Sequence, residues 1–231
     1  IFVGTGEGLS QIIGSSLSSG SVGNGIYKLD ANDNPTRITP DAFVGNAIDE
    51  NSPWAAVNRI AVNPNDVNII VAATQRGLYM TNDGGTTWNQ PTISGLSSGQ
   101  GVADVKWSRD GVNIFAAAGG VNSCKVVRSL NGGFTWERLA SGTHPGYPPT
   151  QGRIEIAIAP TNANIVYLSV ATGGGATYAV FRTEDAGNNW VNIGSKGPQF
   201  DPFGDQNQGW YDNVIAVSPA DPNKVYLGGV D

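Results

Sequence analysis

The sequence predicts an all-β fold built from repeated four-stranded antiparallel sheets, and three observations support this prediction. A motif of the pattern [Ser/Thr]-x-[Asp/Asn]-x-Gly-x-x-Trp occurs three times, and its tryptophans Trp88, Trp136 and Trp190 are separated by 48 and 54 residues. Short runs rich in Val, Ile, Tyr and Phe alternate with Gly, Pro, Asn and Asp, which is typical of strands and turns. No window shows the apolar spacing of an amphipathic helix. A unit that recurs about every 50 residues indicates a repeat architecture.

A second signature marks the start of each repeat. An Ile-Ala-[Val/Ile]-x-Pro run ends at Pro64, Pro160 and Pro219, just past an expected strand, where the missing N–H of proline costs no ladder hydrogen bond. The strand that follows, as at 68–73, is apolar almost continuously and must be covered on both faces. Radially stacked sheets provide this cover, so the predicted fold is a β-propeller. In the second repeat the four strands are expected at about 57–63, 68–74, 77–82 and 87–93.

The repeats divide the chain into five blade units. In the first unit a degenerate turn at 30–33 replaces the motif. Segments 1–4 and 225–228 align with each other as second strands, so we expect one partial propeller domain, a fragment of a larger ring. The expected units are 1–50, 51–98, 99–149, 150–207 and 208–231, the last of them incomplete.

The repeated motif is interpreted as a turn device. Its Asp or Asn can accept hydrogen bonds from backbone N–H groups of the turn, its Gly can adopt a positive φ, and its Trp buries a large ring. The middle copy carries Asn, which cannot act as an acid or base but can accept the same hydrogen bonds. A structural role is therefore predicted for Thr81, Asp83, Gly85 and Trp88; for Ser129, Asn131, Gly133 and Trp136; and for Thr183, Asp185, Gly187 and Trp190.

These motifs resemble the Asp-box (BNR-repeat) propellers, which include sialidases, sortilin-type receptors and xyloglucan-degrading glycoside hydrolases. The chain is most similar in style to large secreted bacterial surface proteins of the type IX secretion kind, which carry openings like residues 3–8 and segments like 208–212. The resemblance covers nearly the whole chain. It implies a secreted or cell-surface bacterial propeller, but not a particular activity, because the box serves the turn.

Composition excludes several classes of function. Charged residues form 14% of the chain and the net charge is −6, with no basic stripe, so no nucleic-acid partner is expected. One cysteine and one histidine exclude an intrachain disulfide and cannot build a zinc site. No apolar run is long enough to span a membrane, and no export signal is present in this segment.

No cofactor or metal is expected, although a structural calcium ion is left open. Asp30, Asn32 and Asn34 alternate as at the start of a calcium loop, and Asp201 and Asp205 could form another oxygen cluster. Neither run has the downstream glutamate of a helix–loop–helix calcium site, and ordinary Asx turns are the favoured interpretation.

The candidate binding residues lie on or beside loops that enter the innermost strands, at the face where propellers usually bind ligands. Aromatic rings beside amide and charged groups suit carbohydrate or protein contacts, although packing of the loops by these rings is the favoured interpretation. His144 is expected to be a surface or loop-packing residue and not a general base. The candidate set is Trp54, Arg59, Asp104, Tyr147, Arg153, Trp210, Tyr211 and Asp212.

The sequence therefore favours a secreted binding or adhesion module with a glycan or protein at its central face, and further blades from the same or a partner chain. The alternative is a glycoside hydrolase whose active site is only partly contained here, which would need two carboxylates facing one bond. Asp49, Glu50, Asp104 and Asp212 are available, but no residue is predicted to be catalytic, because neither a sialidase opening nor xyloglucanase catalytic segments are found.

Overall fold

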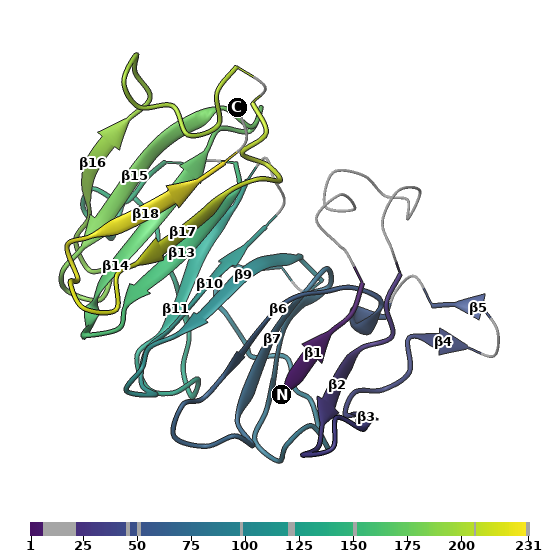
Figure 1. The fold of residues 1–231 in the computed structure, drawn as a ribbon. Coiled ribbons are helices and arrows are strands. Elements are labelled where there is room, and N and C mark those ends of the chain that lie inside the picture. Colours follow the sequence, from purple (N-terminus) through teal and green to yellow (C-terminus); the bar gives the residue numbers. More distant parts are fainter. Residues whose placement is uncertain are drawn as a thin grey trace.

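A computed structural model describes residues 1–6, 22–44, 47–49, 52–97, 99–119, 123–149, 152–205 and 207–229. Figure 1 shows a fan of twisted antiparallel sheets that succeed one another in chain order, with the chain ends at opposite sides of the fan. The only helical segment among these residues is the 3₁₀ turn η1 (Pro53–Ala55). The predicted all-β propeller architecture is confirmed.

Two sheets have the predicted four strands. One consists of β9 (Val102–Trp107), β10 (Ile114–Ala118), β11 (Lys125–Ser129) and β12 (Glu137–Arg138). The other consists of β13 (Ile154–Ala159), β14 (Asn162–Ala171), β15 (Thr177–Thr183) and β16 (Val191–Ser195). Neighbouring strands in each sheet are consecutive in sequence and antiparallel, as short turns require.

The sheet before these has three strands: β6 (Val57–Val62), β7 (Ile70–Thr74) and β8 (Gly77–Thr81). The fourth strand expected at 87–93 is reduced to an isolated bridge between Met80 and Asn89, so that prediction is wrong. Pro91 lies two residues beyond the bridge and has no N–H to continue the ladder.

The remaining strands lie toward the two ends of the chain. β1 (Phe2–Gly4), β2 (Ile26–Leu29) and β3 (Pro35–Arg37) form one sheet, and β4 (Phe43–Val44) pairs with β5 (Ala47–Ile48). β17 (Val214–Val217) pairs with β18 (Val225–Gly228).

The core lies between successive sheets. β7 and β10 are buried along their whole length, as their apolar sequences predict. Each interface joins two neighbours: Phe115 of β10, for example, packs in one cluster with Ile156 and Leu168 of the next sheet. The innermost strands β6, β9, β13 and β17 contact one another in that order and line the inner side of the fan (Figure 1).

Candidate functional site

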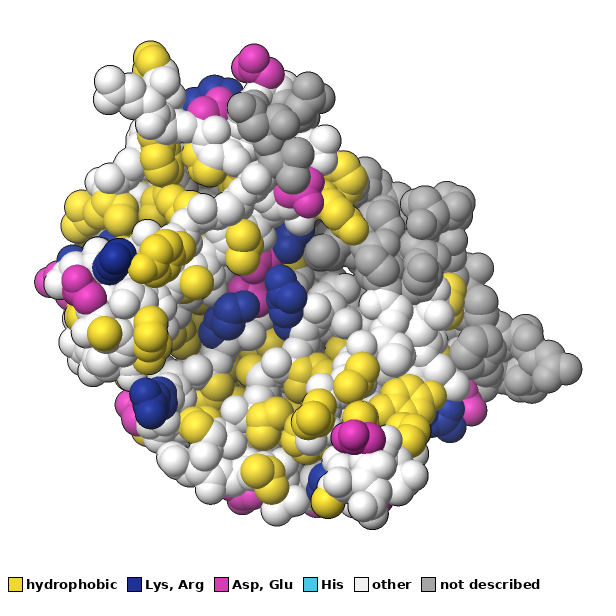
Figure 2. All heavy atoms as spheres, viewed as in Figure 1, with side chains coloured by type: hydrophobic (Ala, Val, Ile, Leu, Met, Phe, Trp, Pro, Cys, Tyr) yellow, Lys and Arg dark blue, Asp and Glu magenta, His cyan; other side chains and the backbone are white. Residues whose placement is uncertain are grey.

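Equivalent positions on three inner strands carry charged side chains. Arg59 pairs with Ala73, Asp104 with Ala117 and Glu155 with Ser169, and these partners lie at the same level of their ladders. Because the inner strands contact one another, the shared register brings the three charges together at the inner side of the fan. Figure 2 shows basic and acidic side chains gathered near the middle of this face.

Two further charges complete this group, which we call the axial cluster: Arg59, Asp104, Lys106, Arg153 and Glu155. Lys106 lies two residues after Asp104, and Arg153 two residues before Glu155, so each pair projects to one side of its extended segment. Lys106 forms an ion pair with Asp104. Arg153 donates from Nε and Nη2 to Glu155 Oε1, at 3.2 and 2.5 Å.

Arg59 joins the two carboxylates from a third strand. Its Nε lies 3.6 Å from Asp104 Oδ1, and its Nη2 lies 3.8 Å from Glu155 Oε2. Asp104 Oδ2 also accepts a hydrogen bond of 2.9 Å from the backbone N–H of Ile156. The cluster therefore couples the inner strands of three successive sheets.

The two carboxyl groups are buried, with side-chain exposures of 0% for Asp104 and 2% for Glu155. Burial raises the pKa of Glu155 to about 7, and the charge of Asp104 adds to the rise, whereas Arg153 and Lys106 oppose it. The neutral form of Glu155 is consequently easier to populate than that of a glutamate in water.

Arg153 also fixes the turn that precedes β17. Its Nη1 donates to the carbonyl oxygens of Trp210 and Tyr211, at 3.2 and 2.5 Å. The two rings lie 5.5 Å apart between centroids with an interplanar angle of 53°. Tyr211 is exposed, so this turn presents an aromatic surface beside the axial cluster.

Two candidate anchors are not accessible, and their expected role is corrected here. Trp54 is buried in η1, with its ring centroid 5.1 Å from those of Tyr79 and Trp88. Tyr147 is buried against Trp190, and its hydroxyl accepts a 2.8 Å hydrogen bond from the backbone N–H of Val126. Both rings fasten loops to the sheets, and neither presents a face to a ligand.

The expected role of Arg153 also changes. Arg153 is buried and its donors are occupied, so it positions the turn and is not free to orient a ligand. His144 is buried beside Ala140 and Thr143, so of its two expected roles, on the surface or packing a loop, the structure shows the packing one. Asp212 is half-buried at the end of the aromatic turn, where its N–H donates to Gln208.

Glu155 and Lys106 were missed by the sequence reasoning. The inner strand at 104–107 lacks the proline that ends this signature in the other copies, so the signature alone does not fix its register. The second strands can be aligned instead, because Ile70, Ile114 and Val166 each pair with the first residue of a repeated motif. This alignment places Asp104 and Glu155 level with Arg59 on the inner strands. That internal alignment was the available signal.

The three repeated turns share one hydrogen-bond pattern. In the first, Thr81 Oγ1 donates to Asp83 Oδ1 at 2.7 Å, and Asp83 Oδ1 accepts from Thr87 N at 2.9 Å. Asn131 and Asp185 accept the equivalent bonds in the other two copies. The motif glycines, Gly85, Gly133 and Gly187, have φ values of 99°, 95° and 94°.

The oxygen clusters considered for calcium are occupied by protein groups. Asp30 Oδ1 accepts from the backbone N–H groups of Asn32 and Asn34, which makes an Asx turn. Asp201 accepts from Thr177 and pairs with Lys196. Within the described ranges, no three His, Cys, Asp or Glu residues are grouped as a metal site.

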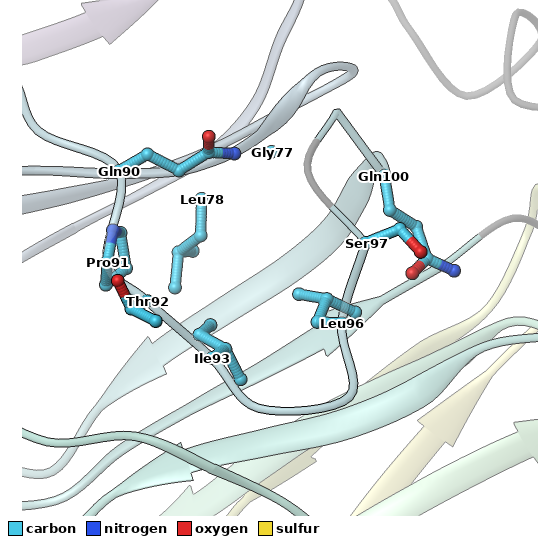
Figure 3. A pocket seen from close by; sticks show the side chains of 9 residues that line it. All are labelled: Gly77, Leu78, Gln90, Pro91, Thr92, Ile93, Leu96, Ser97 and Gln100. Carbon is cyan, nitrogen blue, oxygen red and sulfur yellow. The ribbon is translucent and has the colours of Figure 1, made fainter.

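A separate cavity of about 230 Å³ lies beside the connection from β8 to β9. Leu78, Ile93 and Leu96 lie between Gln90 on one side and Gln100 on the other (Figure 3). Its lining carries no charged group, so the cavity lacks the acidic and basic side chains that the axial cluster offers to a ligand.

Comparisons with known proteins support the fold. No family model matches the sequence, and no match was found among curated proteins. Among solved structures, a GH74 enzyme from Niastella koreensis is similar with a TM-score of 0.64 and 18% identity, over 88% of this chain and 32% of that one. A GH74 xyloglucanase from Xanthomonas campestris is similar with a TM-score of 0.53 and 20% identity, over 81% of this chain and 28% of that one. An ancestral GH74 enzyme is similar with a TM-score of 0.53 and 21% identity, over 71% of this chain and 21% of that one.

The chain thus spans about a fifth to a third of the length of these structures. At such identities the similarity establishes the β-propeller fold, and function must be argued from the site. No helix in the described part of the chain is long and apolar enough to cross a membrane.

Proposed function

We propose that this chain is a glycan-binding propeller module of a secreted or cell-surface protein. The observation that carries the proposal is the exposed Tyr211 ring, paired with Trp210 and tied through Arg153 to the axial cluster. Aromatic faces beside fixed polar groups suit sugars, because a sugar ring has an apolar face and a rim of hydroxyl groups. A polysaccharide is also the substrate class named for one of the similar structures, the GH74 xyloglucanase.

The alternative function is glycoside hydrolysis, and one observation favours it. Asp104 and Glu155 are paired carboxyl groups, and the raised pKa of Glu155 would suit a general acid. Two observations weigh against it: both groups are buried, and both are engaged by Arg or Lys side chains. A buried, ion-paired carboxylate cannot reach a scissile bond without breaking its pair, so binding is preferred.

Affinity electrophoresis through gels containing xyloglucan or polygalacturonate tests the proposal. Tyr211→Ala should weaken retention by about tenfold or more, equivalent to about 1.4 kcal/mol of binding free energy, because it removes the exposed ring. Phe134→Ala is the matched control: Phe134 is also exposed, but it lies in the turn between β11 and β12. Its retention should equal that of the unmodified chain.

Two results would contradict the proposal. If neither polysaccharide retards the chain, it is not a module for these glycans. If the unmodified chain releases reducing ends from a polysaccharide, and Asp104→Asn or Glu155→Gln abolishes this release, the chain is a glycoside hydrolase instead.

A further inference from the structure

The axial cluster exposes its cations and hides its carboxylates. The side chains of Arg59 and Lys106 are 45% and 33% exposed, whereas those of Asp104 and Glu155 are 0% and 2% exposed. The buried carboxylates therefore hold the two cations in place from beneath. A molecule that enters the inner side of the fan meets the cations first.

Arg59 retains its hydrogen-bonding capacity. Its contacts with Asp104 and Glu155 are 3.6 and 3.8 Å long, beyond hydrogen-bond distance, and no other partner is found for it in the described part of the chain. A guanidinium group has five N–H donors in a planar fork that matches a carboxylate in bidentate fashion. The side chain is thus positioned electrostatically while its donors remain available.

The local charge favours an anion although the chain as a whole does not. Three cations face two carboxyl groups in the cluster, which leaves one excess positive charge when both carboxyls are ionised and two when Glu155 is protonated. The net charge of the chain is −6, so non-specific attraction of polyanions is not expected. An anionic ligand would be recognised at this site in particular.

We propose that Arg59 and Lys106 bind the carboxylate of an acidic glycan, one containing uronic acid residues, while Tyr211 contacts a sugar ring of the same ligand. The inference rests on the proposed glycan-binding function and specifies its ligand class. Arg59 and the aromatic turn belong to one connected group, because Glu155 lies between Arg59 and Arg153, and Arg153 donates to the carbonyl of Tyr211.

Polygalacturonate and its methyl ester form a matched pair of probes, since esterification removes the negative charge and keeps the sugar chain. In titration calorimetry the unmodified chain should bind polygalacturonate at least tenfold more tightly than the ester. Arg59→Gln and Lys106→Gln should each weaken binding of polygalacturonate about tenfold and leave binding of the ester unchanged. Arg37→Gln is the control, because Arg37 pairs with Asp41 on the outer part of the first sheet and faces no candidate site.

Arg59→Lys distinguishes a loss of ligand binding from a loss of folding. It keeps the charge that compensates Asp104 and Glu155 but loses the bidentate fork, so it should melt like the unmodified chain and still bind polygalacturonate more weakly.

Three outcomes would overturn the inference in distinguishable ways. Equal affinity for the acid and its ester would refute carboxylate recognition while the glycan-binding proposal stands. Arg59-dependent binding of dextran sulfate as tight as that of polygalacturonate would refute selectivity for carboxylate sugars. Failure to bind any of these polysaccharides, or xyloglucan, would refute the proposed function itself.

Discussion

At the scale of single residues, Glu155 shows how burial and a neighbouring charge change the pKa of a glutamate. It is buried beside Asp104, and these two effects raise its pKa from the ordinary 4.5 to about 7. The folded chain therefore binds a proton between these pH values that the unfolded chain has released. The free energy of unfolding should consequently fall as pH rises through this window.

We predict that Glu155→Gln removes this pH dependence. Glutamine has the same shape, stays neutral and can still accept a hydrogen bond from Arg153. Urea denaturation at pH 5 and pH 8 would measure the difference in unfolding free energy, which should shrink in the variant. Glu184→Gln is the control, because Glu184 is exposed, and it should retain the fall seen in the unmodified chain. An unchanged slope in Glu155→Gln would show that another group takes up the proton.

Sequence reasoning reached part of the site at this scale. Arg59, Asp104 and Arg153 belong to the predicted set because they lie on or beside the loops that enter the innermost strands. The sequence could not distinguish the aromatic residues that pack the loops from those that face solvent, since an aromatic residue in a loop has the same sequence context in both cases. Only the contacts of Trp54 with Trp88, and of Tyr147 with Trp190, distinguish the two cases.

At the scale of elements, the repeated turn was the most predictable part of the molecule. Every bond in it is local, so residue types at fixed spacing determine it. The middle copy shows which bonds matter: Asn131 Oδ1 accepts from Thr135 N as a carboxylate would, and its Nδ2 donates to Thr135 Oγ1 at 2.8 Å. The fourth strand near Pro91 was less predictable, because a strand at a sheet edge depends on pairing with one neighbour alone.

Asp83 permits a direct test of this interpretation. Thr87 occupies the place of Thr135, so Asp83→Asn should form the same bonds and melt close to the unmodified chain at pH 7. Asp83→Ala should melt lower, because Thr87 N and Thr81 Oγ1 lose their partner. Calorimetry would measure the melting temperatures of the unmodified chain, Asp83→Asn and Asp83→Ala. If the Asn variant is as unstable as the Ala variant, the charge of Asp83 itself is required.

Acid adds a second readout for the same variants. Hydrogen bonds from the backbone and hydroxyl of Thr87, and from Thr81, lower the pKa of Asp83 from 3.8 to about 2. The stabilisation by Asp83 is therefore complete above about pH 4 and is lost as pH falls toward 2. The Asn variant has no such group, so its melting temperature should decline less than that of the unmodified chain over this range.

At the scale of the whole molecule, each sheet depends on the next for burial. Val71, Phe115 and Tyr167 occupy equivalent positions on successive second strands, and all three are buried by the following sheet. Tyr226 occupies the same position on β18 and is 55% exposed, with Val214 exposed on the adjacent strand. Val3 is exposed on β1, at the opposite side of the fan (Figure 1). The two outer sheets thus present apolar faces of the kind that other sheets cover.

We expect these faces to make the 231-residue chain associate in solution. The Val3 face and the Tyr226 face are different surfaces, so contact between them is head-to-tail and can extend beyond a dimer. Sedimentation velocity over a range of concentrations should show growing species for the unmodified chain and a smaller average mass for the double variant Tyr226→Ser with Val214→Thr. Phe134→Ser is the control: its exposed ring lies on a turn, where the equivalent Thr86 and Asn188 are also exposed, and it should associate like the unmodified chain. A monodisperse monomer at every concentration would show that the exposed faces are stable in water without a covering sheet.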